Sequence, residues 1–128
     1  MTKHYAIAID GPSGAGKSTI ARAMASRLAF IYIDTGAMYR AIGLRAARAH
    51  VAGDDAAGVT ALLPDIRLEL TFVNGEQHIL LNGEDVSRDI RTEEASIYAS
   101  QVSAIPAVRS FLLDFQRSFS RENNVIMD

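Results

Sequence analysis

Residues 11–18 read Gly-Pro-Ser-Gly-Ala-Gly-Lys-Ser, the most informative stretch of the sequence. It fits the P-loop pattern G-x-x-x-x-G-K-[ST] at every fixed position. Its glycines let the backbone curl so that successive N–H groups point into one concavity, and the helix that follows adds the positive end of its dipole. Lys17 would supply a charge to the β- and γ-phosphates, and the Ser18 hydroxyl would bind Mg²⁺. The stretch therefore predicts a site for the phosphates of a nucleoside triphosphate.

The alternative is a glycine-rich turn that matches the pattern by chance, expected on the order of a few times per thousand chains of this length. The context favours a P-loop, because residues 4–9 form an apolar run typical of a strand buried on both faces in a parallel sheet. After the loop, Ile20, Met24 and Leu28 recur at the spacing of a helix with one packed face. The candidate catalytic residue is Lys17. The residues expected to bind the triphosphate are Gly11, Pro12, Ser13, Gly14, Ala15, Gly16, Lys17, Ser18 and Thr19.

A second strand and helix repeat this order. Residues 30–33 are apolar and predict another buried strand, and residues 37–52 are rich in Ala and Arg without proline, which predicts a helix. Strand, helix, strand and helix in succession indicate an α/β fold, in which a parallel sheet is flanked by helices.

The middle of the chain follows a different pattern. Apolar and polar residues alternate over 66–72, as in a strand with one solvated face, and Asn74-Gly75 and Asn82-Gly83 are hairpin signals. We expect a small antiparallel β meander here, inserted into the P-loop fold. The predicted divisions are 1–63 for the first part of the core, 64–91 for the inserted acceptor-side subdomain, and 92–128 for the return to the core.

The last part of the chain returns to the α/β pattern. Thr92 is a predicted N-cap, and Pro106 is predicted to stand in the first turn of a further amphipathic helix. Residues 125–128 read Val-Ile-Met-Asp, a third buried parallel strand. A sheet of this kind usually continues with further crossover units, so we expect an incomplete fold.

Composition excludes several classes of function. The net charge is −2, from 13 basic and 15 acidic side chains, which gives no field for binding nucleic acid. No cysteine is present, so disulfides and thiolate metal sites are excluded, and the three histidines lack ligand spacing. No apolar run is long enough to span a bilayer or to form a signal peptide. We expect a cytoplasmic monomer that binds no membrane.

Residues 7–44 closely resemble bacterial cytidylate kinases. The specific signature is Asp-Thr-Gly-Ala-Met-Tyr-Arg at 34–40, and residues 85–91 and 99–109 are similar to the family as well. The resemblance covers essentially the whole chain, and the small inserted sheet is also a family feature. It implies a nucleoside monophosphate kinase that transfers a phosphoryl group from ATP to CMP or dCMP with Mg²⁺.

The resemblance also implies an acceptor site. Thr35 and Arg40, which flank Tyr39, would hold the sugar-phosphate of CMP, and Ser100 and Arg109 would hydrogen-bond the cytosine ring. On chemistry alone, an arginine after a strand end suits a monophosphate, but a solvated helix arginine is the alternative for Arg40. The alternative is stronger for Arg109, on the polar side of its helix, and the role of Ser100 depends on the resemblance alone.

Asp128 ends an apolar run that resembles a Walker B strand, and it is expected to reach Mg²⁺ through water. The family continues beyond this point with a Gly-Arg-Asp segment, an arginine-bearing lid and the adenine-binding end of the sheet. We therefore expect the sequence to be a truncated part of the enzyme, and very weak turnover from 128 residues alone. The alternatives are a non-catalytic nucleotide-binding fragment or a P-loop kinase with another small acceptor. A GTPase is disfavoured because the base-reading Asn-Lys-x-Asp is absent.

Overall fold

The computed structural model of the 128-residue chain describes residues 4–9 and 16–128. The chain divides into two compact units. Unit 1 consists of Met1–Thr35 with Phe115–Asp128, and unit 2 consists of Gly36–Asp114. The domain boundaries predicted at 63/64 and 91/92 stay a prediction.

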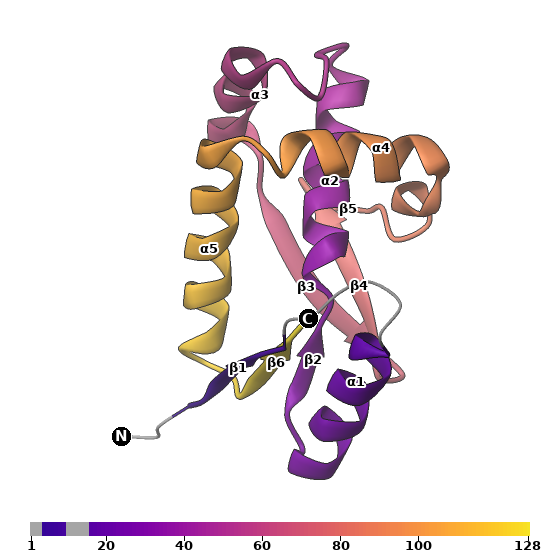
Figure 1. Ribbon diagram of the computed structural model, residues 1–128, viewed down its shortest axis with the longest axis vertical. Helices are drawn as coiled ribbons and strands as arrows, with labels where there is room; N and C mark the ends of the chain where they lie inside the picture. The colour runs from indigo at the N-terminus through magenta and orange to yellow at the C-terminus, as the bar shows by residue number, and fades with distance from the viewer. Residues whose placement is uncertain (1–3, 10–15) are drawn as a thin grey trace. The chain divides into compact units, whose positions relative to one another are not determined.

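Unit 1 is built on a parallel sheet of three short strands, β1 (Ala6–Ala8), β2 (Ile31–Ile33) and β6 (Val125–Met127). Their order is β1-β6-β2, so the last strand of the sequence lies between the first two (Figure 1). Helix α1 (Lys17–Leu28) connects β1 to β2 and packs on the sheet. The predicted parallel α/β arrangement is confirmed.

The core of unit 1 forms where α1 meets the sheet. Ala21 and Ala25 of α1 and Ile126 of β6 are buried, and five partly buried side chains surround them: Ile7, Ile9, Met24, Phe30 and Tyr32. On β1 only Ile7 is partly buried, whereas Ala6 and Ala8 are exposed. The prediction of a first strand buried on both faces is therefore wrong for the described residues, among which β1 pairs with β6 alone.

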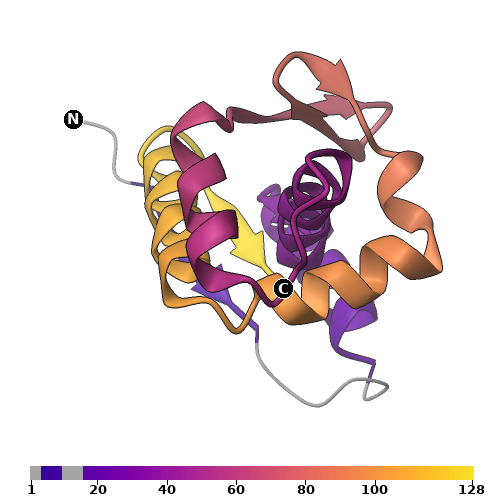
Figure 2. The ribbon, with the colours of Figure 1, turned by 90° about the horizontal axis from the view of Figure 1, so that it is seen from above.

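Helix α2 (Thr35–Arg48) is the central helix of unit 2, with the other elements of that unit around it (Figure 2). It buries a continuous face of small and medium side chains, among them Met38 and Ile42. The prediction placed this helix at 37–52. It begins earlier, and it ends earlier because the backbone of His50 takes a left-handed φ of 58°.

The sequence analysis missed α3 (Ala56–Leu62), which is seven residues long. The carboxylate of Asp55 caps it by accepting a hydrogen bond from the Gly58 N–H at 3.0 Å. Short 3₁₀ turns, η1 (Leu63–Asp65) and η2 (Asp89–Arg91), were missed as well.

The antiparallel meander is confirmed. Strands β3 (Leu68–Val73), β4 (Glu76–Leu81) and β5 (Glu84–Asp85) pair in sequence order. Asn74 and Gly75 have φ of 52° and 79°, and Asn82 and Gly83 have φ of 51° and 86°, as expected of two tight hairpin turns. The first strand of the meander, β3, begins two residues later than predicted.

Helices α4 (Glu93–Val102) and α5 (Pro106–Ser120) follow the meander. The Thr92 hydroxyl accepts a hydrogen bond from the Ala95 N–H at 3.1 Å, so the predicted cap is confirmed, and Pro106 opens α5 as predicted. Helix α4 lies so close to α2 that a Cβ built on Gly43 would be 2.8 Å from the Tyr98 Cβ.

Candidate functional site

Two predicted phosphate-binding residues open helix α1. Lys17 and Ser18 are its first two residues, and Gly16 before them has a φ of 77°, a conformation that favours glycine. The first turn of a helix presents unsatisfied N–H groups and a positive dipole end, which together suit an anion. Gly16, Lys17, Ser18 and Thr19 thus lie where the sequence predicts, whereas the calls on Gly11, Pro12, Ser13, Gly14 and Ala15 fall outside the described residues.

The carboxylate of Asp128 joins this helix start to the sheet. Its Oδ1 lies 2.9 Å from Lys17 Nζ, and its Oδ2 accepts a hydrogen bond from Ser18 Oγ at 2.6 Å. A second hydroxyl, that of Tyr32, donates to the same Oδ2 at 2.8 Å. The Asp128 side chain is only 6% exposed, whereas that of Lys17 is 28% exposed. The Lys17 side chain is therefore ion-paired and still partly exposed.

Asp128 is fixed by its backbone as well. Its N–H donates to the Ile33 carbonyl at 3.0 Å, and its own carbonyl accepts from the Thr35 N–H at 3.0 Å. The Thr35 hydroxyl donates to the same carbonyl oxygen. These bonds hold the carboxyl ends of β2 and β6 together beside the start of α1, which is where open α/β sheets bind their ligands.

Lys17, Ser18, Tyr32 and Asp128 form one polar cluster. The electrostatics of this cluster favour an ionised Asp128. Burial acts to raise the pKa of this carboxyl, but the hydrogen bonds from Ser18, Lys17 and Tyr32 outweigh it and hold the pKa below its usual value. The pKa of Tyr32 is raised, first by burial and then by its hydrogen bond to Asp128. At neutral pH Asp128 is therefore ionised and the Tyr32 hydroxyl is neutral.

The residues of this cluster fit a hard cation. Ser18 and Asp128 offer oxygen atoms, the donors that Mg²⁺ prefers, and Mg²⁺ is usually held by one or two carboxylates together with substrate phosphates. Within residues 4–9 and 16–128, no group of three or more His, Cys, Asp or Glu side chains forms a self-sufficient metal site. A magnesium ion here would therefore depend on phosphate oxygens for much of its coordination.

Four of the five residues predicted to bind the acceptor nucleotide lie in unit 2. Tyr39 and Arg40 stand on α2 and are half-buried, whereas Ser100 on α4 and Arg109 on α5 are exposed. Thr35, by contrast, belongs to unit 1, where its hydroxyl binds the Asp128 carbonyl. The roles of all five in acceptor binding stay predictions.

Sequence reasoning missed two residues of the cluster. The sequence pattern places Tyr32 in an apolar strand and Arg22 in a helix, and predicts no contact between them. The Arg22 guanidinium carbon lies 5.1 Å from the centre of the Tyr32 ring, within reach of a cation–π interaction. The residue type could have identified Tyr32, because a phenol on a strand predicted to be buried needs a hydrogen-bond partner.

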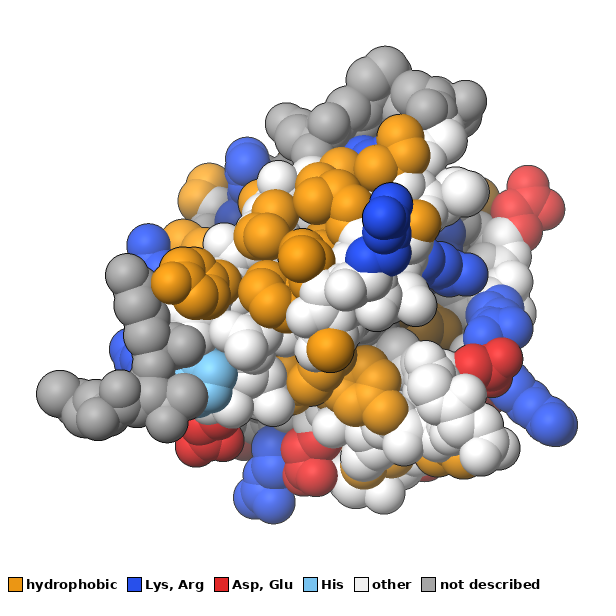
Figure 3. All heavy atoms as spheres, turned by 90° about the horizontal axis from the view of Figure 1, so that it is seen from below, with side chains coloured by type: hydrophobic (Ala, Val, Ile, Leu, Met, Phe, Trp, Pro, Cys, Tyr) orange, Lys and Arg blue, Asp and Glu red, His pale blue; other side chains and the backbone are white. Residues whose placement is uncertain are grey.

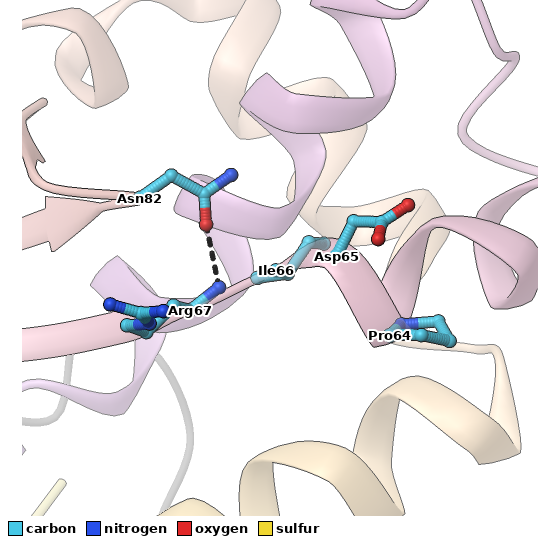
Figure 4. Close-up of a pocket in the computed structure, with 5 residues that line it drawn as sticks. All are labelled: Pro64, Asp65, Ile66, Arg67 and Asn82. Atoms are coloured by element: carbon cyan, nitrogen blue, oxygen red, sulfur yellow. Dashed lines mark hydrogen bonds between the residues drawn. The ribbon is translucent and has the colours of Figure 1, made fainter.

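A separate hollow of about 540 Å³ lies in unit 2 near the base of the meander (Figure 4). It is lined by Pro64, Asp65, Ile66, Arg67 and Asn82. The Asn82 side-chain oxygen accepts a hydrogen bond from the Arg67 N–H at 2.7 Å, which ties the β4–β5 turn to the start of β3. No predicted site residue lines this hollow, and we assign the Asn82 contact a structural role.

Several large apolar side chains of unit 1 are exposed: Tyr5 by 53%, Ile20 by 55% and Leu28 by 48%. Hydrophobic side chains gather on part of the face seen in Figure 3. Of the helices in the described part of the chain, none is long and apolar enough to cross a membrane.

The parallel sheet, the small antiparallel sheet and the lysine–serine pair at the start of α1 define the class of this protein as an α/β P-loop kinase. Within that class, the chain belongs to the cytidylate kinase family, whose pattern it matches over residues 7–128.

Curated relatives support this assignment. The chain is 46% identical over its whole length to the cytidylate kinase of Syntrophotalea carbinolica, of which it covers 54%. It is 48% identical to that of Symbiobacterium thermophilum, with 99% of this chain and 57% of the relative covered. It is 51% identical to that of Geobacter sp. strain M21 over 95% of this chain and 52% of the relative. The chain thus spans about half the length of the relatives it matches.

Proposed function

We propose that this chain carries the triphosphate site and the acceptor site of a cytidylate kinase, which converts CMP or dCMP with ATP into CDP or dCDP and ADP. The observation that carries the proposal is the cluster of Lys17, Ser18 and Asp128 at the start of α1. The relatives named cytidylate kinase support the choice of acceptor.

In the proposed reaction, a phosphate oxygen of CMP attacks the γ-phosphorus of ATP as the bond to the β,γ-bridging oxygen breaks. Lys17 balances charge on the β- and γ-phosphates, and the first-turn N–H groups of α1 bind phosphate oxygens. Ser18 would bind Mg²⁺ directly and Asp128 would bind it through water, and the ion when bound supplies positive charge to the phosphate oxygens. Arg40 would bind the acceptor phosphate through two parallel hydrogen bonds, a geometry that suits guanidinium groups.

The proposed context is that of a cytoplasmic enzyme of pyrimidine metabolism, active as a monomer. ATP and CMP are its proposed small-molecule ligands, and neither nucleic acid nor a membrane takes part. The net charge of −2 supports the exclusion of nucleic acid.

The proposal is tested by measuring ADP release from MgATP with CMP, dCMP, UMP and AMP as separate acceptors. We expect CMP and dCMP to be preferred, with CDP or dCDP found as the product. A preference for AMP would replace the cytidine assignment by another acceptor. Nucleotide binding by calorimetry without ADP release from any acceptor would instead identify a non-catalytic nucleotide-binding protein.

A further inference from the structure

The packing of the Tyr32 ring does not explain why this position carries a hydroxyl group. The ring packs against the buried cluster of Ala21, Ala25 and Ile126, and a phenylalanine would fill the same space. The O–H group of a partly buried phenol favours a hydrogen-bond partner, because part of its contact with water is lost. That partner is Asp128 Oδ2, at 2.8 Å.

We propose that Tyr32 is a positioning residue that holds the Asp128 carboxylate in the orientation that binds Lys17 and Ser18. The inference rests on the proposed function, because the groups so positioned are those assigned to ATP and Mg²⁺. Tyr32 itself touches neither ligand in this scheme and acts through Asp128.

Both oxygens of the Asp128 carboxylate have partners among the neighbouring side chains. Oδ2 receives two hydroxyl donors, from Tyr32 and Ser18, while Oδ1 faces the Lys17 ammonium. A carboxylate has about four acceptor positions and a broad terminal torsion, so with Lys17 on Oδ1 and Ser18 alone on Oδ2 it would be held less firmly. A second donor on the same oxygen restricts that torsion, and the side chains of Lys17 and Ser18 are thereby fixed relative to each other.

Tyr32 is itself held from the side of α1. The Arg22 guanidinium lies over its ring, and Arg22 stands one helical turn after Ser18. The contacts therefore run from Arg22 on α1 to the Tyr32 ring, and from the Tyr32 hydroxyl to Asp128, which follows β6. Asp128 in turn contacts Ser18 at the start of α1. Each step joins described residues of unit 1.

The experiment is a double-mutant cycle on MgATP affinity, measured by titration calorimetry with Tyr32→Phe, Asp128→Ala and the double variant. The hydroxyl donates to a charged acceptor, so we expect Tyr32→Phe to weaken MgATP binding about ten-fold. In the Asp128→Ala background the same change is expected to have less than about a two-fold effect. Tyr5→Phe, an exposed tyrosine next to β1, is the matched control and is expected to bind MgATP like the wild type.

Urea unfolding of each variant shows whether it folds, and Asp128→Leu, which also lacks an acceptor for the Tyr32 hydroxyl, replaces Asp128→Ala in the cycle if the alanine variant does not fold. The inference is overturned if Tyr32→Phe binds MgATP normally, or if its effect is equally large without the Asp128 carboxylate. The KM for CMP gives a further check, because it is expected to stay unchanged in Tyr32→Phe.

These outcomes are distinct from a failure of the proposed function. A wild-type protein that binds MgATP with the expected coupling but phosphorylates no CMP would refute the kinase assignment and leave the role of Tyr32 intact. Ordinary CMP phosphorylation with an additive cycle would refute the role of Tyr32 alone. A wild-type protein that binds no MgATP would overturn both.

Discussion

The ammonium of Lys17 and the carboxylate of Asp128 lie 2.9 Å apart, although the two residues stand near opposite ends of the sequence. The pairing follows from the strand order, because β6 lies between β1 and β2 and delivers Asp128 to the start of α1. A triphosphate site on this chain therefore depends on the last strand of the sequence as much as on the loop near its beginning.

Removing the guanidinium of Arg40 tests the acceptor site. We expect Arg40→Ala to raise the KM for CMP at least about ten-fold with little change in the KM for ATP, because a bidentate contact to the acceptor phosphate is lost. Steady-state kinetics with each substrate varied in turn measures both values. Arg45→Ala, on the same helix, is the matched control and should behave like the wild type. Equal effects of Arg40→Ala on the two KM values would move Arg40 out of the acceptor site.

A change at Gly43 tests the close approach of α2 and α4. Replacing a glycine within a helix by alanine normally stabilises it by up to about 1 kcal/mol. At Gly43 the new Cβ would stand 2.8 Å from the Tyr98 Cβ and 3.1 Å from its carbonyl carbon, neither of which can rotate away. We expect Gly43→Ala to lower the free energy of unfolding by about 1–3 kcal/mol in urea denaturation. A more stable variant would show that the helices can separate freely.

The carboxyl of Asp85 in the meander is expected to titrate abnormally. Hydrogen bonds from the Ser87 hydroxyl and N–H, and then from His78, lower its pKa from 3.8 to about 2. Because the folded pKa lies below the unfolded one, the stability that this group contributes is present above pH 3.8 and is lost as the pH falls toward about 2. The carboxyl carbon shift of Asp85, followed by NMR, should have its midpoint near that lower value.

Two serine variants test whether Ser87 causes the low pKa of Asp85. Ser87→Ala removes the strongest donor, so the pKa of Asp85 should rise toward its ordinary value. Ser120→Ala removes a hydroxyl that binds the Arg117 carbonyl instead, and should leave the Asp85 titration unchanged. A wild-type midpoint at the ordinary value would mean that these hydrogen bonds do not persist in solution.

The parts of the fold that sequence predicts well are those set by local rules. Asn74-Gly75 and Asn82-Gly83 specify tight turns because both positions need positive φ, and the observed backbone has it. Thr92 specifies a helix start because its hydroxyl can bind a free N–H three residues on. Short elements such as α3 were missed, since seven residues carry too little periodicity to stand out.

The site was predictable only in part. The pattern at 11–18 identifies Lys17 and Ser18 without any structure, because the chemistry of phosphate binding fixes their spacing. The partnership of Tyr32 with Asp128 depends on β2 and β6 being neighbours, with Tyr32 opposite Ile126. No local pattern in the sequence encodes that strand order. The prediction that β1 is buried on both faces failed for a related reason, because burial depends on which elements cover a strand and not on its composition alone.

Lys17 is proposed to bind the triphosphate at the start of α1, and titration calorimetry with MgATP measures that role. Lys17→Met should weaken MgATP binding by at least about thirty-fold, because a partly desolvated charge on the β- and γ-phosphates is lost. Arg27→Met, at the exposed far end of α1, is the matched control and should bind like the wild type. Unchanged MgATP affinity in a folded Lys17→Met protein would contradict the account.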